Sequence, residues 1–314
     1  MSLRIAVTGR QGQLARALDE AAEAFNVEIV HLGRPQLDLA APETIEPALK
    51  AAEPNIVVNA AAYTAVDKAE EEATIASLIN GTSAGVVAEV ARALGAPIIH
   101  LSTDYVFDGA KRSPYVEEDP VAPTSAYGTS KLAGELAVAA ATDDHVILRT
   151  AWVYAPYGKN FVRTMLKLAE TRPEVRVVAD QHGCPTYAPD IAAAIFRVAR
   201  NLLTEPFNPR LRGTFHLAGR GETSWAGFAA EIFAILAAKG IRPPTLTPIT
   251  SAEYPTPARR PANSRLNCSK LARIHGVDLP PWRESVRICL ERLLSAPETL
   301  DGRLIKNEME RTAV

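Results

Sequence analysis

Hydrophobic positions in the first half of the chain form two alternating kinds of run. Short, continuously apolar runs rich in β-branched residues lie at residues 3–7, 27–32, 55–62, 97–102 and 145–152. Continuous hydrophobicity is typical of strands that are buried on both faces. Longer, alanine-rich amphipathic stretches, such as residues 12–25 and 74–94, separate these runs. The pattern therefore predicts an α/β fold with a doubly wound parallel sheet covered by helices on both faces.

The pattern changes after Trp152, where Pro and Gly become frequent and loops interrupt the helices. An amphipathic stretch at residues 190–203, followed by an apolar run at 213–219, predicts a further helix and strand that return to the sheet. The rest predicts a smaller, mainly helical lobe. We assign residues 1–152 plus about 185–220 to a Rossmann-like domain, about 153–184 and 221–300 to the lobe, and 301–314 to a loose polar tail.

Composition places the chain among soluble globular proteins, with 47% hydrophobic and 22% charged residues in 314. A net charge of −2 argues against a large nucleic-acid surface. The cysteines Cys184, Cys268 and Cys289 have no paired spacing, which fits a reducing compartment and predicts neither disulfide nor zinc site. With no charged-then-apolar leader and no long uncharged apolar run, we expect a cytoplasmic protein without membrane or nucleic-acid partners. Composition leaves both a monomer and a homodimer open.

A glycine turn follows the first predicted strand. Gly9, Gly12 and Ala15 have the spacing Gly-x-x-Gly-x-x-Ala and lead into the next predicted helix. At such a turn, backbone N–H groups approach a pyrophosphate, which also lies at the positive end of the helix. The spacing differs from the tighter Gly-x-Gly fingerprint, so the alternative is a turn with only a structural role.

The end of the second predicted strand indicates which dinucleotide is bound. NAD sites usually have an acidic residue there, whereas an arginine accommodates the 2′-phosphate of NADP. Here Arg34 occupies this point and Arg10 lies in the glycine turn, while Asp38 is placed to contact the adenine edge. We therefore predict NADPH as the cofactor, with NADH as the alternative. The competing interpretation is that both arginines are ordinary solvated side chains.

Tyr127 and Lys131 share one face of a predicted helix, because they lie four residues apart. A nearby ammonium stabilises a phenolate and lowers the tyrosine pKa from its usual value near 10 toward the working range. The same ammonium suits the ribose of a nicotinamide. Thr103, at the end of the 97–102 run, is placed either to hydrogen-bond a substrate carbonyl or to cap a turn. These groups predict proton and hydride transfer to a carbonyl.

Several segments together are similar to the extended short-chain dehydrogenase/reductase family, and more narrowly to its branch of dTDP-4-dehydrorhamnose reductases. They are the glycine turn and residues 59–70, 102–109, 127–131, 149–161, 180–186 and 254–267. The resemblance extends from the first strand to about residue 290, and residues 180–186 and 255–266 are its most specific parts. It implies NADPH-dependent reduction of the 4-keto group of dTDP-6-deoxy-L-lyxo-4-hexulose to dTDP-L-rhamnose.

The resemblance also implies residue roles. Tyr127 would donate the proton, Lys131 would orient the cofactor and the phenol, and Thr103 would tune protonation. The expected cofactor contacts are Gly9, Arg10, Gln11, Gly12, Gln13, Leu14, Arg34, Asp38, Leu39, Ala60, Ala61, Ala62, Tyr63, Thr64, Leu101, Tyr127 and Lys131. The expected substrate contacts are Thr103, Asp104, Tyr127, Trp152, Asn160, Arg259 and Arg260.

Four of these substrate contacts have alternative interpretations. Arg259 and Arg260 lie in a proline-bounded loop, where guanidinium groups suit phosphate oxygens, but arginines are also common at surfaces. Trp152 is equally consistent with a core position. Asn160 is also placed to cap the helix that follows it.

We expect no metal site. Some relatives hold magnesium between subunits through carboxylates, but here Ala17 and Pro189 occupy those neighbourhoods.

The alternatives to a reductase are two other enzyme classes and one non-catalytic class. A dehydratase needs an Asp-Glu pair after the threonine, whereas Tyr105 follows Asp104 here, which disfavours dehydration. The remaining alternatives are a sugar-nucleotide epimerase and a regulatory subunit similar to the beta subunit of methionine adenosyltransferase. The intact Thr103, Tyr127 and Lys131 disfavour the regulatory subunit.

Overall fold

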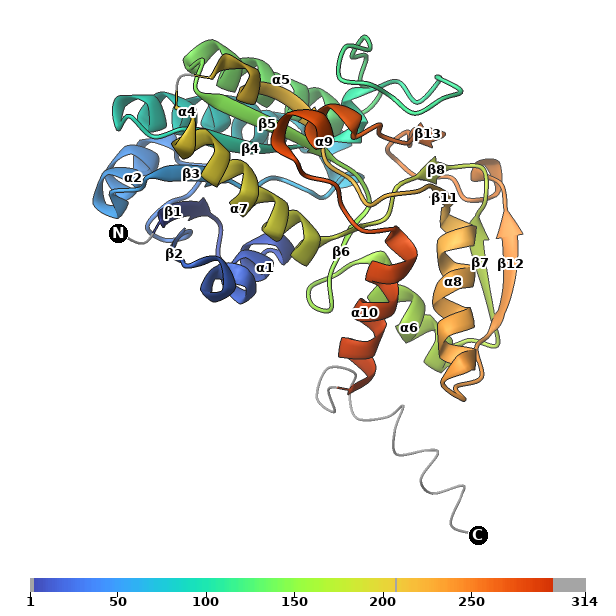
Figure 1. Cartoon of the computed structure of the whole chain (residues 1–314). Coiled ribbons are helices and arrows are strands. Elements are labelled where there is room, and N and C mark those ends of the chain that lie inside the picture. The colour runs from blue at the N-terminus through green and yellow to red at the C-terminus, as the bar shows by residue number, and fades with distance from the viewer. Residues whose placement is uncertain (1–2, 207, 296–314) are drawn as a thin grey trace.

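A six-stranded sheet organises most of the chain (Figure 1). In the computed structural model, which describes residues 3–206 and 208–295, the strand order is β2-β1-β3-β4-β5-β10. The strands are β1 (Leu3–Thr8), β2 (Val27–Leu32), β3 (Ile56–Asn59), β4 (Ile98–Thr103), β5 (His145–Thr150) and β10 (Gly213–His216). All neighbouring strands pair in parallel. The predicted doubly wound α/β fold is therefore confirmed, and the strand expected at 213–219 joins the sheet.

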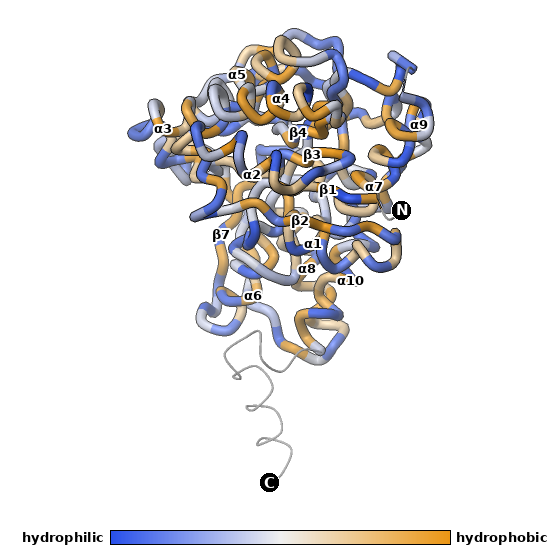
Figure 2. Tube along the Cα trace, turned by 90° about the vertical axis from the view of Figure 1, so that its left-hand side faces the viewer, coloured by the Kyte–Doolittle hydropathy of each residue, from blue (hydrophilic) through white to orange (hydrophobic). Residues whose placement is uncertain are grey.

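Helices cover both faces of this sheet. On one face, α1 (Gln13–Ala22) packs beside α7 (Ala188–Thr204); on the other lie α2 (Ile45–Ala52), α4 (Ser83–Ala93) and α5 (Ala126–Ala141) (Figure 1). Alternate strand residues serve the two layers because side chains alternate across a strand. Val58 packs in the core under α1 and α7, whereas its neighbour Val57 packs in the core under α2, α4 and α5. Figure 2 shows hydrophobic segments on the central strands and hydrophilic segments along the outer loops.

The stretch predicted as one helix at 74–94 contains a π-helical turn. It consists of α3 (Ala73–Ser77), the π turn Leu78–Thr82 and α4, without a break. Among the described helices, residues 73–93 are long and apolar enough by composition to cross a membrane. Here they form a core helix, because Gly81 and Gly85 allow close packing against Ala133 and Ala137 of α5.

The lobe combines three helices with short strands. The helices are α6 (Phe161–Thr171), α8 (Trp225–Ala238) and α10 (Trp282–Ser295). The strands are β6 (Val153–Tyr154), β7 (Glu174–Val178), β8 (His182–Gly183), β9 (Thr186–Tyr187), β11 (Thr223–Ser224), β12 (Thr245–Ile249) and β13 (Asn263–Ser264). They form pairs β7–β12 and β6–β9 and a small sheet β11-β8-β13. Buried Tyr154, Phe228 and Trp282 centre the core of the lobe.

The remaining elements are short connections. They are α9 (Ser269–His275) and the 3-10 turns Glu23–Phe25, Pro42–Thr44, Lys68–Glu70, Asp104–Val106, Pro209–Leu211 and Ser251–Glu253. The division into two domains stays a prediction. Its expected tail, 301–314, lies outside the described residues.

Candidate active site

The glycine turn lies where the strand order of the sheet reverses. The chain leaves β1 for β2 on one side and later returns to β3 on the other, which opens a crevice at the carboxyl ends of β1 and β3. Gly9 has a φ of +94°, a left-handed conformation that strains any residue with a Cβ. Gly12 precedes α1, and no side chain caps this helix end. The first N–H groups of α1 are therefore free to hold an anion.

A pocket of about 740 Å³ opens beside this turn. It is lined by loops after three strands: residues 9–11 after β1, several between 33 and 40 after β2, and 61–65 after β3. Ten expected cofactor residues lie here: Gly9, Arg10, Gln11, Arg34, Asp38, Leu39, Ala61, Ala62, Tyr63 and Thr64. Gly12, Gln13 and Leu14 lie at the adjoining end of α1, and Ala60 directly follows β3. The cradle fits a dinucleotide in size, glycine content and unsatisfied N–H groups.

Two arginines lie at this pocket without carboxylate partners. Arg10 donates to the side chain of Gln36, and its methylene groups lie against Gly33. Arg34 is exposed at the same pocket. Within residues 3–206 and 208–295, neither guanidinium forms an ion pair. Both are therefore free to meet a phosphate. Asp38 accepts a hydrogen bond from the Ala40 N–H at 3.0 Å.

Thr8 and Asn80 hold the loops of this pocket in place, and no pattern in the sequence predicted either role. Thr8 Oγ1 accepts hydrogen bonds from the N–H groups of Ala60 and Ala61, both at 3.0 Å. Asn80, in the π turn, bonds the N–H and the carbonyl of Tyr63 at 2.8 and 3.0 Å and donates to Ser130 Oγ at 2.9 Å. The π turn thus connects the pocket to helix α5.

Helix α5 places Tyr127 and Lys131 beside the end of β4. Ser125 caps the helix by accepting the Gly128 N–H at 3.1 Å. The half-buried Tyr127 ring packs edge-on against Tyr105, with ring centroids 5.5 Å apart. Thr103 caps the turn after β4 by accepting the Tyr105 N–H at 3.3 Å, and it lies within hydrogen-bond reach of the Tyr127 hydroxyl. Thr103 therefore caps this turn, as its alternative interpretation predicted, and also lies beside the phenol of Tyr127.

The pKa of Tyr127 departs from the expectation. Burial raises the pKa of Tyr127 to about 12, against a lowering hydrogen bond from Thr103, and the charge of Asp104 raises it further. The expected lowering by Lys131 is wrong for this arrangement, because Lys131 Nζ donates to the carbonyl of Leu101 at 2.6 Å. Burial also lowers the pKa of Lys131 to about 8, although the Glu135 charge opposes this shift. Leu101, an expected cofactor contact, is thus the partner of Lys131.

A buried ion pair lies directly behind Lys131. Glu135, one helical turn further along α5, accepts hydrogen bonds from Arg149 Nε at 2.9 Å and Arg149 Nη2 at 2.7 Å. Ser102 Oγ donates to the same carboxylate. The side chains of Arg149 and Glu135 are only 7% and 5% exposed. A charged residue inside each apolar stretch was the only sign of this pair in the sequence.

Asp104 is a second carboxylate at this end of β4. It is 3% exposed and accepts a hydrogen bond from Thr103 Oγ1 at 3.0 Å. Burial raises the pKa of Asp104 to about 6, while the Ser264 and Thr103 hydroxyl groups lower it. Asp104 therefore lies between Thr103 and the lobe strand β13.

The arginine loop approaches the loop after β3. Arg260 forms an ion pair with Asp67 at 2.9 Å, and the Ala258 N–H donates to the other oxygen of Asp67 at 3.3 Å. Arg259 is exposed. The loop therefore lies on the same side as the expected cofactor contacts Tyr63 and Thr64.

Asn160 and Trp152 join the two parts of the molecule. Asn160 caps α6 by accepting the Arg163 N–H at 3.1 Å, as its alternative interpretation had it, and its amide donates to Gln13 Oε1 at 2.9 Å. Trp152 packs against core residues of both the sheet domain and the lobe. Its ring stacks on Trp225 with centroids 3.5 Å apart.

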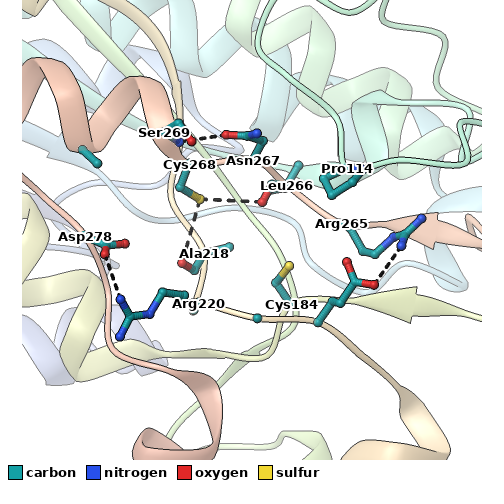
Figure 3. Close-up of a pocket in the computed structure, with 14 residues that line it drawn as sticks. Pro114, Cys184, Ala218, Arg220, Arg265, Leu266, Asn267, Cys268, Ser269 and Asp278 are labelled. Carbon is teal, nitrogen blue, oxygen red and sulfur yellow. Dashed lines mark hydrogen bonds and ion pairs between the residues drawn. The ribbon is translucent and has the colours of Figure 1, made fainter.

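A separate pocket of about 390 Å³ holds none of the expected site residues (Figure 3). Its arginines are paired, Arg265 with Glu222 at 2.9 Å and Arg220 with Asp278 at 3.4 Å. Burial raises the pKa of Cys184 to about 11 and that of Cys268 to about 12, so both remain thiols. Over the described part of the chain, no three His, Cys, Asp or Glu side chains converge as metal ligands.

Fold and site together define a member of the extended short-chain dehydrogenase/reductases. Residues 3–295 match the family model described as RmlD substrate binding domain. A dTDP-4-dehydrorhamnose reductase of Sinorhizobium fredii is 53% identical over 292 residues, which cover 93% of this chain and 98% of that protein. The chain belongs to the family of dTDP-4-dehydrorhamnose reductases, as the sequence motifs predicted.

Solved structures agree. A dTDP-4-dehydrorhamnose reductase from Clostridium acetobutylicum is 39% identical with a TM-score of 0.84, over 93% of this chain and all of that one. The enzyme from Bacillus anthracis, solved in complex with NADP, is 33% identical with a TM-score of 0.85 over 93% of this chain and 100% of its own. These relatives favour the reductase over the epimerase and the regulatory subunit.

Proposed function

We propose that this chain reduces the 4-keto group of dTDP-6-deoxy-L-lyxo-4-hexulose with NADPH and so forms dTDP-L-rhamnose. Family membership supports the substrate. The observation that carries the reaction is the contact of Tyr127 with Thr103 at the carboxyl edge of the sheet, one strand from the glycine-turn pocket. The proposal includes a cytoplasmic location and a monomer or homodimer.

We propose that the cofactor is held by the glycine turn and the three loops of the 740 Å³ pocket. The free N–H groups at the start of α1 suit its pyrophosphate, and the guanidinium groups of Arg10 and Arg34 suit a 2′-phosphate. When bound, NADPH supplies the hydride. Lys131 and Leu101 lie at the end of β4, where the nicotinamide ribose is expected.

The proposed proton donor is the Tyr127 hydroxyl. Because its pKa is raised to about 12, this phenol keeps its proton at neutral pH until it passes the proton to the ketone oxygen. Thr103 lies within hydrogen-bond reach of the phenol and favours the phenolate that remains. Lys131, one helical turn away, carries positive charge below its pKa of about 8 and is held by the Leu101 carbonyl, where the nicotinamide ribose is expected.

Substrate binding is proposed on the lobe side of these groups. Arg259 and Arg260 suit the pyrophosphate of the sugar nucleotide, and Asp67 holds the arginine loop in place. Asp104 and Trp152 suit the sugar. Asn160 contributes by positioning Gln13 against α6, since its amide is already bonded to protein groups.

The test is turnover of NADPH with the 4-keto sugar nucleotide, followed by loss of nicotinamide absorbance. Tyr127→Phe is expected to lower kcat by about 10²- to 10⁴-fold, the range for a positioned acid, with NADPH binding little changed. Tyr154→Phe is the matched control, because the buried Tyr154 hydroxyl lies in the lobe core and has no hydrogen-bond partner in residues 3–206 and 208–295.

Each other result identifies a different function. If Tyr127→Phe turns over at the parent rate, Tyr127 is not the donor. If purified protein retains NAD and interconverts sugar epimers, it is an epimerase, and if the parent protein shows no turnover, a regulatory role replaces the reductase.

A further inference from the structure

Trp152 has an unusual conformation at the junction of sheet and lobe. It follows β5, where the chain leaves the sheet, and its φ is +49°. This left-handed conformation is rare for a bulky residue and persists only where surrounding contacts enforce it. The indole is half-buried and contacts core residues on both sides of the junction.

One face of the Trp152 indole is covered by Trp225, the first residue of α8. The two rings are nearly parallel, with an interplanar angle of 9° and centroids 3.5 Å apart. Phe161 packs behind Trp225 at a centroid distance of 4.7 Å. Trp225 is therefore itself held in place by the lobe core.

The other face is covered by the backbone of Gly183 in β8. A Cβ placed on Gly183 would lie 2.4 Å from Trp152 Cε2 and 2.7 Å from both Cζ2 and Nε1. Since ring bonds are about 1.4 Å long, these three distances place the Cβ above Cε2, on a line perpendicular to the ring plane. A Cβ approaching Cε2 within the ring plane would instead lie closer to Nε1 than to Cε2. The stacked Trp225 leaves no space on its own face, so Gly183 lies on the opposite one.

We propose that Trp225 and Gly183 are positioning residues that hold the Trp152 indole between them, so that Trp152 meets the sugar nucleotide with its ring edge and not with a π face. The inference rests on the proposed function, which places Trp152 among the substrate contacts. The edge of an aromatic ring is electropositive, whereas its faces are electronegative. Trp152 therefore selects an oxygen-rich group, a sugar hydroxyl or a phosphate oxygen, over a stacked base or the apolar face of a sugar.

The place of Gly183 and Trp152 in the fold supports this role. Gly183 is paired with Ser264 of β13, and Ser264 lies beside Asp104, next to Thr103. Thr103 in turn lies opposite Thr150 in the sheet, two residues before Trp152. Gly183 and Trp152 are therefore both connected to the end of the sheet where the proposed proton donor lies.

The test compares KM and kcat of Trp225→Ala and Gly183→Ala with the parent. An aromatic pair contributes about 0.5–1.5 kcal/mol, so Trp225→Ala is expected to raise KM for the sugar nucleotide about 2- to 12-fold. The kcat and the Kd for NADPH stay unchanged. Gly183→Ala raises KM in the same direction, because its Cβ displaces the indole, and Trp225→Phe recovers most of the loss.

A double-mutant cycle separates positioning from general destabilisation. If Trp225 acts through Trp152, the variant with both Trp152→Ala and Trp225→Ala has the KM of Trp152→Ala alone. Phe233→Leu, in the buried face of the same helix α8, is the stability control. It lowers the unfolding temperature and leaves KM at the parent value.

A spectroscopic measurement keeps the inference testable without turnover. Contacting indoles couple in circular dichroism, and this signal should disappear equally in Trp152→Phe and Trp225→Phe but persist in Trp282→Phe. Absence of turnover by the parent, with the coupled signal present, overturns the proposed function alone. An unchanged KM in Trp225→Ala, fully additive effects in the double variant, or no coupled signal overturns the positioning role.

Discussion

Replacing Glu135 by Gln tests what holds helix α5, with Tyr127 and Lys131, against the sheet. The substitution keeps the size of the side chain and removes its charge. Arg149 then lies 7% exposed with no anionic partner among the described residues, because the hydrogen bonds from its Nε and Nη2 both end on Glu135. The amide can retain the bond from Ser102 and accept only one of the two guanidinium donors.

The expected loss of stability follows from burial. Removing one partner of a buried ion pair costs about 3–5 kcal/mol, because the remaining charge is left uncompensated. A retained hydrogen bond places Glu135→Gln near the lower limit, about 3 kcal/mol. With an unfolding entropy of about 2.1 cal/mol/K per residue, 1 kcal/mol corresponds to about 1.5 °C in a chain of 314 residues, so the unfolding temperature falls by about 5 °C.

The assay is urea unfolding and a thermal melt of parent and variants. Glu46→Gln is the matched control, because Glu46 pairs with Lys50 on α2 and both side chains are about 60% exposed; its expected cost is below about 0.5 kcal/mol. The double variant Glu135→Leu with Arg149→Met should recover much of the loss, since no charge stays buried. A cost of Glu135→Gln no greater than that of Glu46→Gln, or a double variant that is the least stable, contradicts a stabilising buried ion pair.

Three further predictions concern the cofactor, a buried acid and metal. Arg34→Asp should raise the Kd for NADPH by about 10- to 100-fold, which corresponds to the loss of a charge-assisted hydrogen bond, and should raise the Kd for NADH much less. Fluorescence titration measures both dissociation constants. Equal changes in the two would show that Arg34 does not bind the 2′-phosphate. Burial raises the pKa of Asp104 from 3.8 to about 6, so its contribution to stability is present below pH 3.8 and lost as pH rises through about 6. The unfolding free energy of Asp104→Asn relative to the parent should therefore increase by up to about 3 kcal/mol from about pH 4 to pH 7. Urea unfolding at the two pH values measures this difference, and a difference that does not change with pH contradicts the prediction. Chelation with EDTA should leave turnover unchanged, because Ala17 and Pro189 offer no carboxylate; a loss that Mg²⁺ restores contradicts this.

Local patterns predicted the large elements of the fold. The apolar run at 97–102 and the amphipathic stretch at 190–203 became β4 and α7, because burial on both faces or on one face leaves its period in the sequence. The short strands β8, β11 and β13 were not predictable in this way. Each has two residues and is held by pairing with segments about 40 or 80 residues away, which leave no local period.

In the site, too, features within one helix were predictable, whereas features that depend on contacts between distant segments were not. The four-residue spacing of Tyr127 and Lys131 was visible, because both lie on one helix. Asn80 was not, because its role depends on a π turn and on partners in two other segments, Tyr63 and Ser130. The partner of Lys131 was also hidden, since only the packing of α5 on β4 brings Nζ to the Leu101 carbonyl.

The raised pKa of Tyr127 bears on the direction of the proposed reaction. Oxidation of an alcohol needs a phenolate to accept the proton, whereas reduction of a ketone needs a phenol to donate it. With a pKa of about 12, Tyr127 is a phenol throughout the physiological range, which is the form a reductase uses. Of the neighbouring groups, Thr103 favours the phenolate that is left, whereas Lys131 donates to the Leu101 carbonyl and does not lower the Tyr127 pKa. A site that keeps this phenol protonated suits reduction better than the reverse reaction, which starts from the phenolate.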